Sequence, residues 1–181
     1  MIDKILKGRY VYVSGEERLL LDSGRYVKIN YTSSGQQESV WIFNILMYQL
    51  INNTKTLIIL EEPEAHLYPD AQKDMSELLS LFMSAGNSIL LTTHSPYILG
   101  AINNLLFAHN ISTIVGEKKV FKIVDKEKIL SECSSYYVEN GNISLCFDYE
   151  NNLIQNEVID GASKDINDIF DQLISLENED N

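Results

Sequence analysis

The chain has few of the residues that build disulfides or metal clusters. It contains two cysteines, Cys133 and Cys146, and their spacing fits neither a metal-binding motif nor a redox motif. We therefore expect both to be partly buried thiols that a reducing compartment keeps free.

Basic residues are also scarce, because 14 Lys and Arg stand against 26 Asp and Glu, giving a formal net charge of −12. Such a chain is not built mainly to coat nucleic acid, which requires clustered Lys and Arg. A local exception, "EKKVFKIVDKEK" at residues 117–128, is explained as well by a solvated strand face as by a contact surface.

Long apolar runs are missing as well. No continuous stretch reaches the roughly 18 to 20 residues that cross a bilayer. The N-terminus "MIDKILKGRYVYV" does not have the profile of a signal peptide. We expect a cytoplasmic protein with no membrane association.

The first half of the sequence predicts an α/β core. Short antiparallel strands are expected in "RYVYVSGEERLLLDSGRYVKINY", where Ser-Gly pairs separate β-rich runs. A helix over 36–51, expected to be buried on most sides, is followed by a strand over 56–60, a helix from Pro69 to Gly86 and a strand over 88–93. The two apolar strands are typical of parallel strands covered on both faces.

The second half carries weaker patterns. "STIVG" and "KVFKIVD" favour two further strands, and Asn140-Gly141 favours a hairpin turn. An amphipathic helix is expected from Ser163, with a disordered acidic tail over 177–181. One domain over 1–176 is the simplest organisation.

Ionisable residues follow both apolar strands. Glu61 and Glu62 come directly after the first strand, and His94 follows the second. Because the carboxyl ends of parallel strands share one edge of a sheet, these side chains are expected in one crevice. Two carboxylates and an imidazole suit a metal-phosphate site, in which one carboxylate holds Mg²⁺ and the other orients a water.

Each feature also has an ordinary structural explanation. A Glu-Glu pair after a strand is often only the point where the chain enters solvent, and a single His is often structural. A third element strengthens the functional interpretation: "TSSGQQE" at 32–38 is a loop of small residues that opens a helix, and it presents N–H groups and hydroxyls to an anion.

Together, "TSSGQQE", "LIILEEPEAHLYP" and "LLTTHSP" resemble the signature loop, Walker B strand and histidine switch of ABC-type ATPase heads. The form "EEPEAHLYP" is similar to cytosolic AAA ATPase-like proteins of the overcoming-lysogenization-defect and abortive-infection type, and more distantly to chromosome-maintenance and recombination ATPases. The resemblance covers 31–104 and implies a P-loop NTPase fold.

The resemblance implies roles for particular residues. Glu61 stands where the Walker B motif has an acid near Mg²⁺, Glu62 where the general base lies, and His94 where the switch histidine contacts the γ-phosphate of ATP. Thr32 and Ser34 depart from the commonest leucine and glycine of the signature motif. The signature residues that would grip ATP held by an opposing protomer are Ser33, Ser34, Gly35 and Gln36.

One part of such a head is missing from this sequence. A Walker A loop has the form G-x-x-x-x-G-K-[ST], and none of the nine glycines is followed by lysine. The glutamine switch is not identifiable either. The chain thus resembles only the C-terminal half of a head, and a truncated, split or degenerate ATPase would each give this pattern.

The expected function is part of an ATP-hydrolysing head that needs Mg²⁺ and a segment bearing Walker A. Its expected partners are a second copy or an N-terminal ATPase half, with DNA reached through the complete protein. One alternative is a pseudo-ATPase that only mediates assembly. The other is a Mg²⁺- or Mn²⁺-dependent nuclease or hydrolase whose ligands would be Glu61, Glu62, Glu64, His66 and His94.

Overall fold

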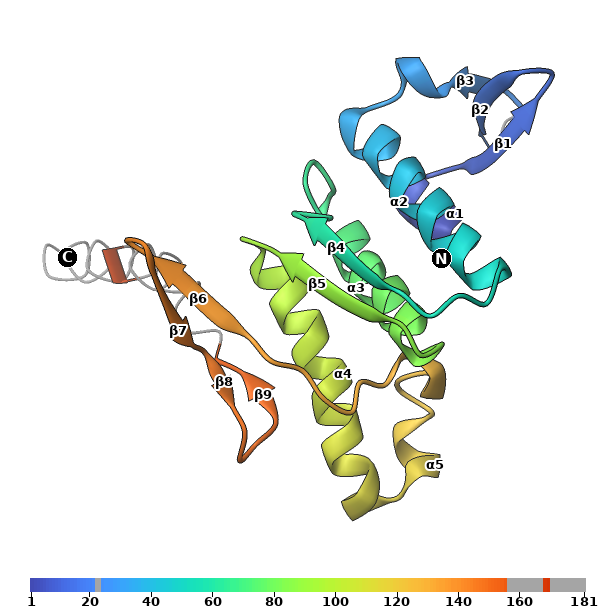
Figure 1. The fold of residues 1–181 in the computed structure, drawn as a ribbon. Coiled ribbons are helices and arrows are strands. Elements are labelled where there is room, and N and C mark those ends of the chain that lie inside the picture. Colours follow the sequence, from blue (N-terminus) through green and yellow to red (C-terminus); the bar gives the residue numbers. More distant parts are fainter. Residues whose placement is uncertain (22–23, 156–167, 170–181) are drawn as a thin grey trace, which may run out of the picture.

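A computed structural model describes residues 1–21, 24–155 and 168–169. At its centre lie two parallel strands, β4 (Leu57–Glu61) and β5 (Ser88–Thr92) (Figure 1). The helix α3 (Pro69–Ser84) connects them, and the helix α2 (Ser34–Ile51) precedes β4. This order confirms the expected α/β core.

The N-terminal segment forms a small antiparallel sheet beside α2. Its strands are β1 (Arg9–Val13), β2 (Glu16–Leu20) and β3 (Tyr26–Lys28), in the order β1-β2-β3. The expected antiparallel strands are therefore confirmed. A short helix α1 (Ile2–Leu6), which the sequence pattern does not reveal, precedes them, and the 3-10 turn η1 (Ile29–Tyr31) leads into α2.

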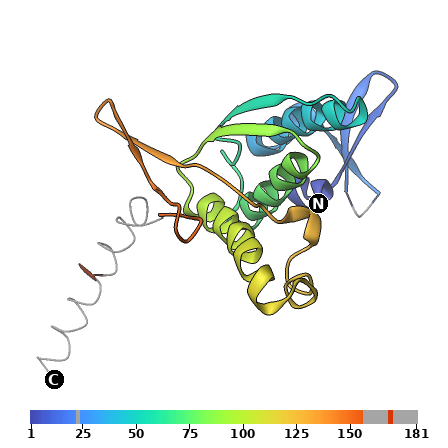
Figure 2. The same ribbon diagram turned by 60° about the horizontal axis from the view of Figure 1, so that its bottom comes forward.

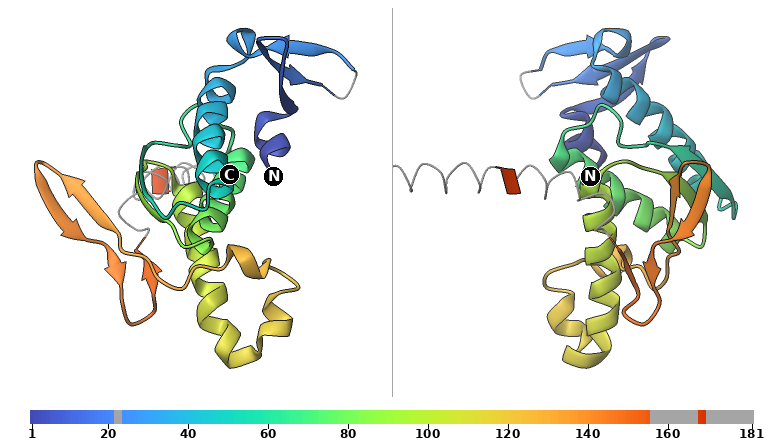
Figure 3. Two further views of the ribbon diagram at one scale, coloured as in Figure 1. Left: turned by 45° about the vertical axis from the view of Figure 1, so that its right-hand side comes forward. Right: turned by 90° about the vertical axis from the view of Figure 1, so that its left-hand side faces the viewer.

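The larger core lies between the helices and one face of the parallel strands. Figure 3 shows α1 beside α2, and α1 also contacts α3. The sheet contributes partly buried side chains that point toward the helices: Ile58, Leu60, Ile89 and Leu91. The fully buried centre comes mainly from α1, α2 and α3: Ile5, Leu6, Val40, Phe43, Leu46, Met75, Leu79 and Phe82.

The other face of the sheet is uncovered by the described residues. Ile59 is 70% exposed and Leu90 57% exposed, so the expectation of strands covered on both faces is wrong. The helix α2 is likewise buried on one side only, since Trp41 and Tyr48 are exposed. A continuous apolar run indicates that both faces of a strand are suited to burial, but it does not indicate which element covers each face.

The helix α4 (Pro96–Val115) follows β5 and packs against α3. It begins at Ser95, whose hydroxyl accepts hydrogen bonds from two backbone N–H groups, with proline at the first helical position. The strand expected at "STIVG" is wrong, because its residues end α4 and Gly116, with φ of 91°, closes that helix. The strand expected at "KVFKIVD" is wrong as well, because the short helix α5 (Glu117–Val120) occupies its start.

The helix α4 also bears on the membrane expectation. A window of 18 of its 20 residues has a mean hydropathy of 1.4, which by length and composition alone suffices to span a membrane, although no such segment was expected from the sequence. Several of its residues are nevertheless buried within the protein, including Ile98 and Leu106. These residues contact α3 and the second core, but only 22% of the apolar window is buried, so α4 packs into the protein along one side.

The last described part contains the 3-10 turn η2 (Lys126–Lys128) and two small hairpins. Strands β6 (Tyr136–Glu139) and β7 (Asn142–Leu145) join at Asn140 and Gly141, both with positive φ, which confirms the expected turn. This hairpin projects from the helices in Figure 2. Strands β8 (Phe147–Asp148) and β9 (Leu153–Ile154) form the other hairpin.

A second, smaller core joins the β8–β9 hairpin to α4. Its buried members are Leu99, Leu105, Leu106, Leu130, Phe147 and Ile154. Both cysteines are partly buried free thiols, as expected. The helix expected from Ser163 and the acidic tail over 177–181 lie outside the described residues, apart from 168 and 169.

Candidate functional site

The parallel register brings the two strand ends together. Glu61 lies opposite Thr92, and the N–H of Glu62 donates to the Thr92 carbonyl at 3.0 Å. Glu62 is the first residue after β4 and His94 the second after β5, and the His94 Nε2 atom lies 3.2 Å from a carboxylate oxygen of Glu62. Of the three side chains expected in one crevice, Glu62 and His94 therefore lie together.

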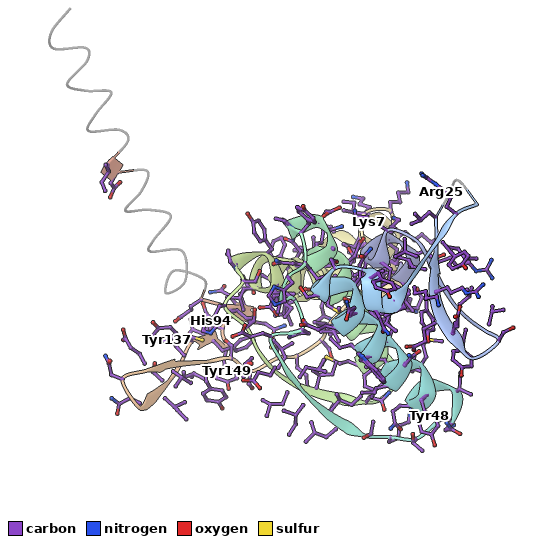
Figure 4. The ribbon with its side chains drawn as sticks, turned by 90° about the horizontal axis from the view of Figure 1, so that it is seen from above. Lys7, Arg25, Tyr48, His94, Tyr137 and Tyr149 are labelled. Carbon is purple, nitrogen blue, oxygen red and sulfur yellow. The ribbon has the colours of Figure 1, made fainter. Side chains whose placement is uncertain are left out.

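Both members of this pair are accessible. The side chain of His94 is 87% exposed and that of Glu62 is 47% exposed. Figure 4 shows His94 at the end of the molecule away from Tyr48, on the side of Tyr137 and Tyr149. A ligand can reach the imidazole and the carboxylate without displacing any part of the core.

Glu62 has an unusual backbone. Its φ of 43° places a non-glycine residue in the left-handed region, directly before Pro63. Such a conformation costs about 1–3 kcal/mol and persists only where its surroundings impose it. Here the N–H bonded to β5 holds one side of Glu62, and its carbonyl accepts from the Ala65 N–H at 2.8 Å. We call residues 62–68 the glutamate loop.

Glu61 lies apart from this pair. As the last residue of β4 it continues the exposed positions of that strand, so it stands on the uncovered face with Leu57 and Ile59. Successive residues of a strand point to opposite faces. The structure therefore places the two glutamates next to each other in the chain but does not aim them at one point.

Glu64 is a participant whose contacts the sequence does not reveal. It is only 6% exposed, and its Oε1 atom accepts hydrogen bonds from the Thr93 hydroxyl and, at 3.3 Å, from the His94 backbone N–H. Its Oε2 atom is buried without a hydrogen-bond partner among the described residues. Position after a conspicuous Glu-Glu pair was the only available signal.

The loop before α2 forms a complete helix cap. Ser33 accepts a hydrogen bond from the Gln36 N–H at 3.3 Å, and the Gln36 side chain accepts from the Ser33 N–H at 3.1 Å. The Gln36 amide also donates to the Leu6 carbonyl at 2.7 Å. The ordinary capping explanation therefore accounts for Ser33 and Gln36, while Ser34 is exposed at the first position of the helix.

Gly35, which the resemblance assigns to the grip on ATP of an opposing protomer, is buried within this chain. A Cβ atom on it would lie 2.6 Å from the carbonyl oxygen of His66. The N-terminus of α2 thus packs directly on the glutamate loop, and only glycine permits this approach. At Gly35, the predicted signature loop therefore contacts the loop that follows the predicted Walker B strand within one chain.

The ligand set of the nuclease alternative is not assembled. Within residues 1–21, 24–155 and 168–169, no group of three or more His, Cys, Asp or Glu side chains is placed to hold a metal ion. Glu64 is buried and bonded to the residues before α4, and His66 is exposed at a left-handed turn. The structure thus gives this alternative no preformed centre.

Comparisons with known proteins agree with this architecture. A solved structure from work on "ATP-driven dimerization and DNA stimulated activation of SMC ATPases" matches with a TM-score of 0.52. The match has 12% sequence identity and covers 93% of this chain and 86% of that chain, so it shows a shared fold. No curated protein matches the chain. The AAA ATPase domain matches residues 1–99, more than half of the sequence, and the chain therefore belongs to the AAA ATPase domain family.

Proposed function

We propose that this chain supplies part of an ABC-type ATPase head whose phosphate cradle comes from another segment. The observation that carries the proposal is the Glu62–His94 pair, which two parallel strands bring within 3.2 Å at their carboxyl ends. This is the edge at which parallel α/β proteins bind ligands. In the proposed site Glu62 orients the attacking water and accepts its proton, and His94 contacts the γ-phosphate, while Glu61 points away from this pair.

The proposed cofactor is Mg²⁺-ATP. Mg²⁺ needs only one or two protein carboxylates, with water and phosphate oxygens completing its shell, and Glu61 is an accessible carboxylate at the strand end. The phosphates need the backbone amides and the lysine of a Walker A loop. This sequence contains no such loop, since no glycine is directly followed by lysine. The residues present therefore fit the attacking water, and Glu61 offers Mg²⁺ a single carboxylate on the uncovered face, but the triphosphate cradle is missing.

The uncovered apolar face supports a partner that completes the head. Ile59 and Leu90 on the sheet, and Trp41 and Tyr48 on α2, expose large apolar side chains. On the sheet, Leu57, Ile59 and Leu90 are neighbours on one face, and a contiguous exposed apolar surface usually marks an interface. We assign it to an N-terminal ATPase half, carried by a partner or by another segment.

Of the residues proposed to act on a second protomer, one side chain remains available. Ser33, Gly35 and Gln36 are occupied by capping and packing, which leaves the exposed Ser34 hydroxyl at the positive end of α2 to meet a phosphate on a second protomer. The similar SMC ATPase is described by ATP-driven dimerization and DNA-stimulated activation. For the complete protein we propose a cytoplasmic homodimer that responds to DNA, in a phage-defence setting suggested by the "EEPEAHLYP" resemblance.

A pseudo-ATPase is the second candidate, because the same exposed apolar face also suits a chain that assembles without hydrolysing ATP. The two candidates share the interface and differ only in turnover. The absence of a glycine-lysine pair favours neither, since the cradle belongs to the other segment in the first case and is dispensable in the second.

Phosphate release from the chain combined with a Walker A-bearing ATPase half tests the proposal. We expect turnover with both parts together, none with either part alone, and loss of turnover with Glu62→Gln. Glu150→Gln, which changes an exposed glutamate in the β8–β9 turn, is the matched control and should leave the rate unchanged. Assembly of the two parts without turnover would instead establish the pseudo-ATPase.

A further inference from the structure

Glu64 connects the two loops that carry the candidate site. It belongs to the glutamate loop, yet both of its hydrogen-bond donors come from the chain that follows β5: the Thr93 hydroxyl and the His94 backbone N–H. Its carboxylate therefore links the loop after β4 to the residues that follow β5. The second donor belongs to the histidine itself.

This carboxylate is costly at its position. Glu64 is 6% exposed, and its Oε2 atom has no partner among the described residues. A buried acceptor without a donor forfeits its hydration, and an apolar side chain of similar length avoids that loss. An apolar side chain would therefore serve the core equally well. What only the acid supplies is the acceptor for the two hydrogen bonds on Oε1, which hold residues 93 and 94.

The residue after His94 is fixed in the same manner. The Ser95 hydroxyl donates to the Gln72 side chain and caps α4 by accepting from the Tyr97 and Ile98 N–H groups. The Gln72 amide in turn donates to the Leu67 carbonyl at 2.8 Å, at the far end of the glutamate loop. The backbone is thus tied on both sides of His94, while the imidazole is 87% exposed.

We propose that Glu64 is a positioning residue for His94. Its buried carboxylate fixes the backbone at residues 93–94, so that the exposed imidazole stands beside Glu62 before any ligand arrives. Preorganisation of this kind needs supporting groups that are themselves locked by packing and hydrogen bonds. The placement of the backbone is independent of what the site binds, and its consequence for hydrolysis rests on the proposed function.

Amide hydrogen exchange of His94, measured by NMR on the chain as it stands, tests the placement. Glu64→Met keeps the length of the side chain and removes the acceptor, so His94 exchange should accelerate by about tenfold or more, the equivalent of one lost charge-assisted hydrogen bond. The nuclear Overhauser contact between the His94 ring and the Glu62 side chain should weaken with it. Glu64→Gln retains an acceptor oxygen and should keep both signals.

Two further variants separate positioning from general stability. Ser80 is a buried polar residue of α3, and its hydroxyl donates to the Lys128 carbonyl. Ser80→Ala should lower Tm without changing His94 exchange. Glu64→Asp keeps the charge but withdraws the acceptor, and should accelerate His94 exchange even if Glu64→Met does not fold. Wild-type exchange in Glu64→Asp, or acceleration in every variant in proportion to its lost stability, would overturn the proposal.

A kinetic measurement on the complete head extends the test. There Glu64→Met should lower kcat by about ten- to a hundredfold with KM for ATP unchanged, because a displaced histidine affects the reacting state and not ground-state binding. Equal kcat values for Glu64→Met and wild type would contradict the catalytic consequence. A wild-type head without any turnover would refute the ATPase proposal, and the exchange data would still decide the role of Glu64.

Discussion

The N-terminus of α2 and the carboxyl ends of β4 and β5 both look like ligand-binding loops in the sequence, but they differ in how well they are explained by the fold. At α2, Ser33 and Gln36 cap the helix reciprocally and Gly35 packs against His66. Every one of these features stabilises the folded chain. The loop would be useful without any ligand.

The strand ends show the opposite balance. Glu62 adopts a left-handed backbone, Glu64 buries an oxygen that has no donor among the described residues, and His94 places its imidazole in solvent. The first two features cost stability, and the third adds no packing. Local arrangements that cost free energy are commonest at functional sites, so the strand ends are the stronger candidate and only Ser34 remains unexplained at α2.

The largest expected effect is at Glu62. In the complete head, Glu62→Gln should leave ATP bound and reduce hydrolysis by about 10²- to 10⁴-fold, the usual loss on removing a general base. Glu61→Gln should instead shift the Mg²⁺ dependence to higher concentrations. Equal and mild effects of both changes on the rate, measured by phosphate release, would reduce the strand end to an exposed polar edge.

Ser34 should show whether the α2 loop has any role beyond capping. On a Glu62→Gln background, Ser34→Arg should abolish ATP-dependent dimerisation of the complete head, because its bulk blocks the approach of a second protomer while the core is untouched. Light scattering with and without ATP measures this. Undiminished dimerisation would make the loop a helix cap only and would end the trans-acting interpretation.

Gly35 should instead affect the fold. Gly35→Ala places a Cβ 2.6 Å from the backbone oxygen of His66, which cannot move aside as the end of a flexible side chain could. We therefore expect a loss of about 1–3 kcal/mol in the free energy of unfolding. Ser34→Ala, one residue earlier and exposed, is the matched control and should change it little. Urea denaturation of the chain distinguishes them, and equal stabilities would show that α2 does not press on the glutamate loop.

A smaller effect is expected from the cap itself. Ser33→Ala removes the side-chain acceptor of the Gln36 N–H and should cost about 1 kcal/mol. Ser33→Asp retains an acceptor and should restore most of that loss. Thermal denaturation of the three proteins measures the difference, and no change in Ser33→Ala would mean that the cap is dispensable.

Sequence reasoning located the strand ends because a parallel pair leaves little freedom once both strands are recognised. The apolar runs before Glu61 and His94 were sufficient for this, and the register followed. The uncovered face was not predictable, because Ile59 and Leu90 are apolar whether or not a partner covers them.

Other features depend on contacts between distant residues. The buried state of Glu64 arises from Thr93 and His94, and that of Gly35 from His66, so neither follows from local pattern. The helix α4 had a local signal in Ser95 and Pro96, a side-chain cap followed by proline. Its β-branched end, at residues 113–115, favours a strand when it is considered alone.

Calorimetric titration with Mg²⁺-ATP tests the central claim most directly, because the claim divides the ATP site between this chain and a segment bearing the phosphate cradle. We expect weak or undetectable binding by the chain alone and strong binding once a Walker A-bearing half is added, since the cradle supplies most of the ground-state affinity. Micromolar binding by the isolated chain would contradict this division and would require a nucleotide site of its own.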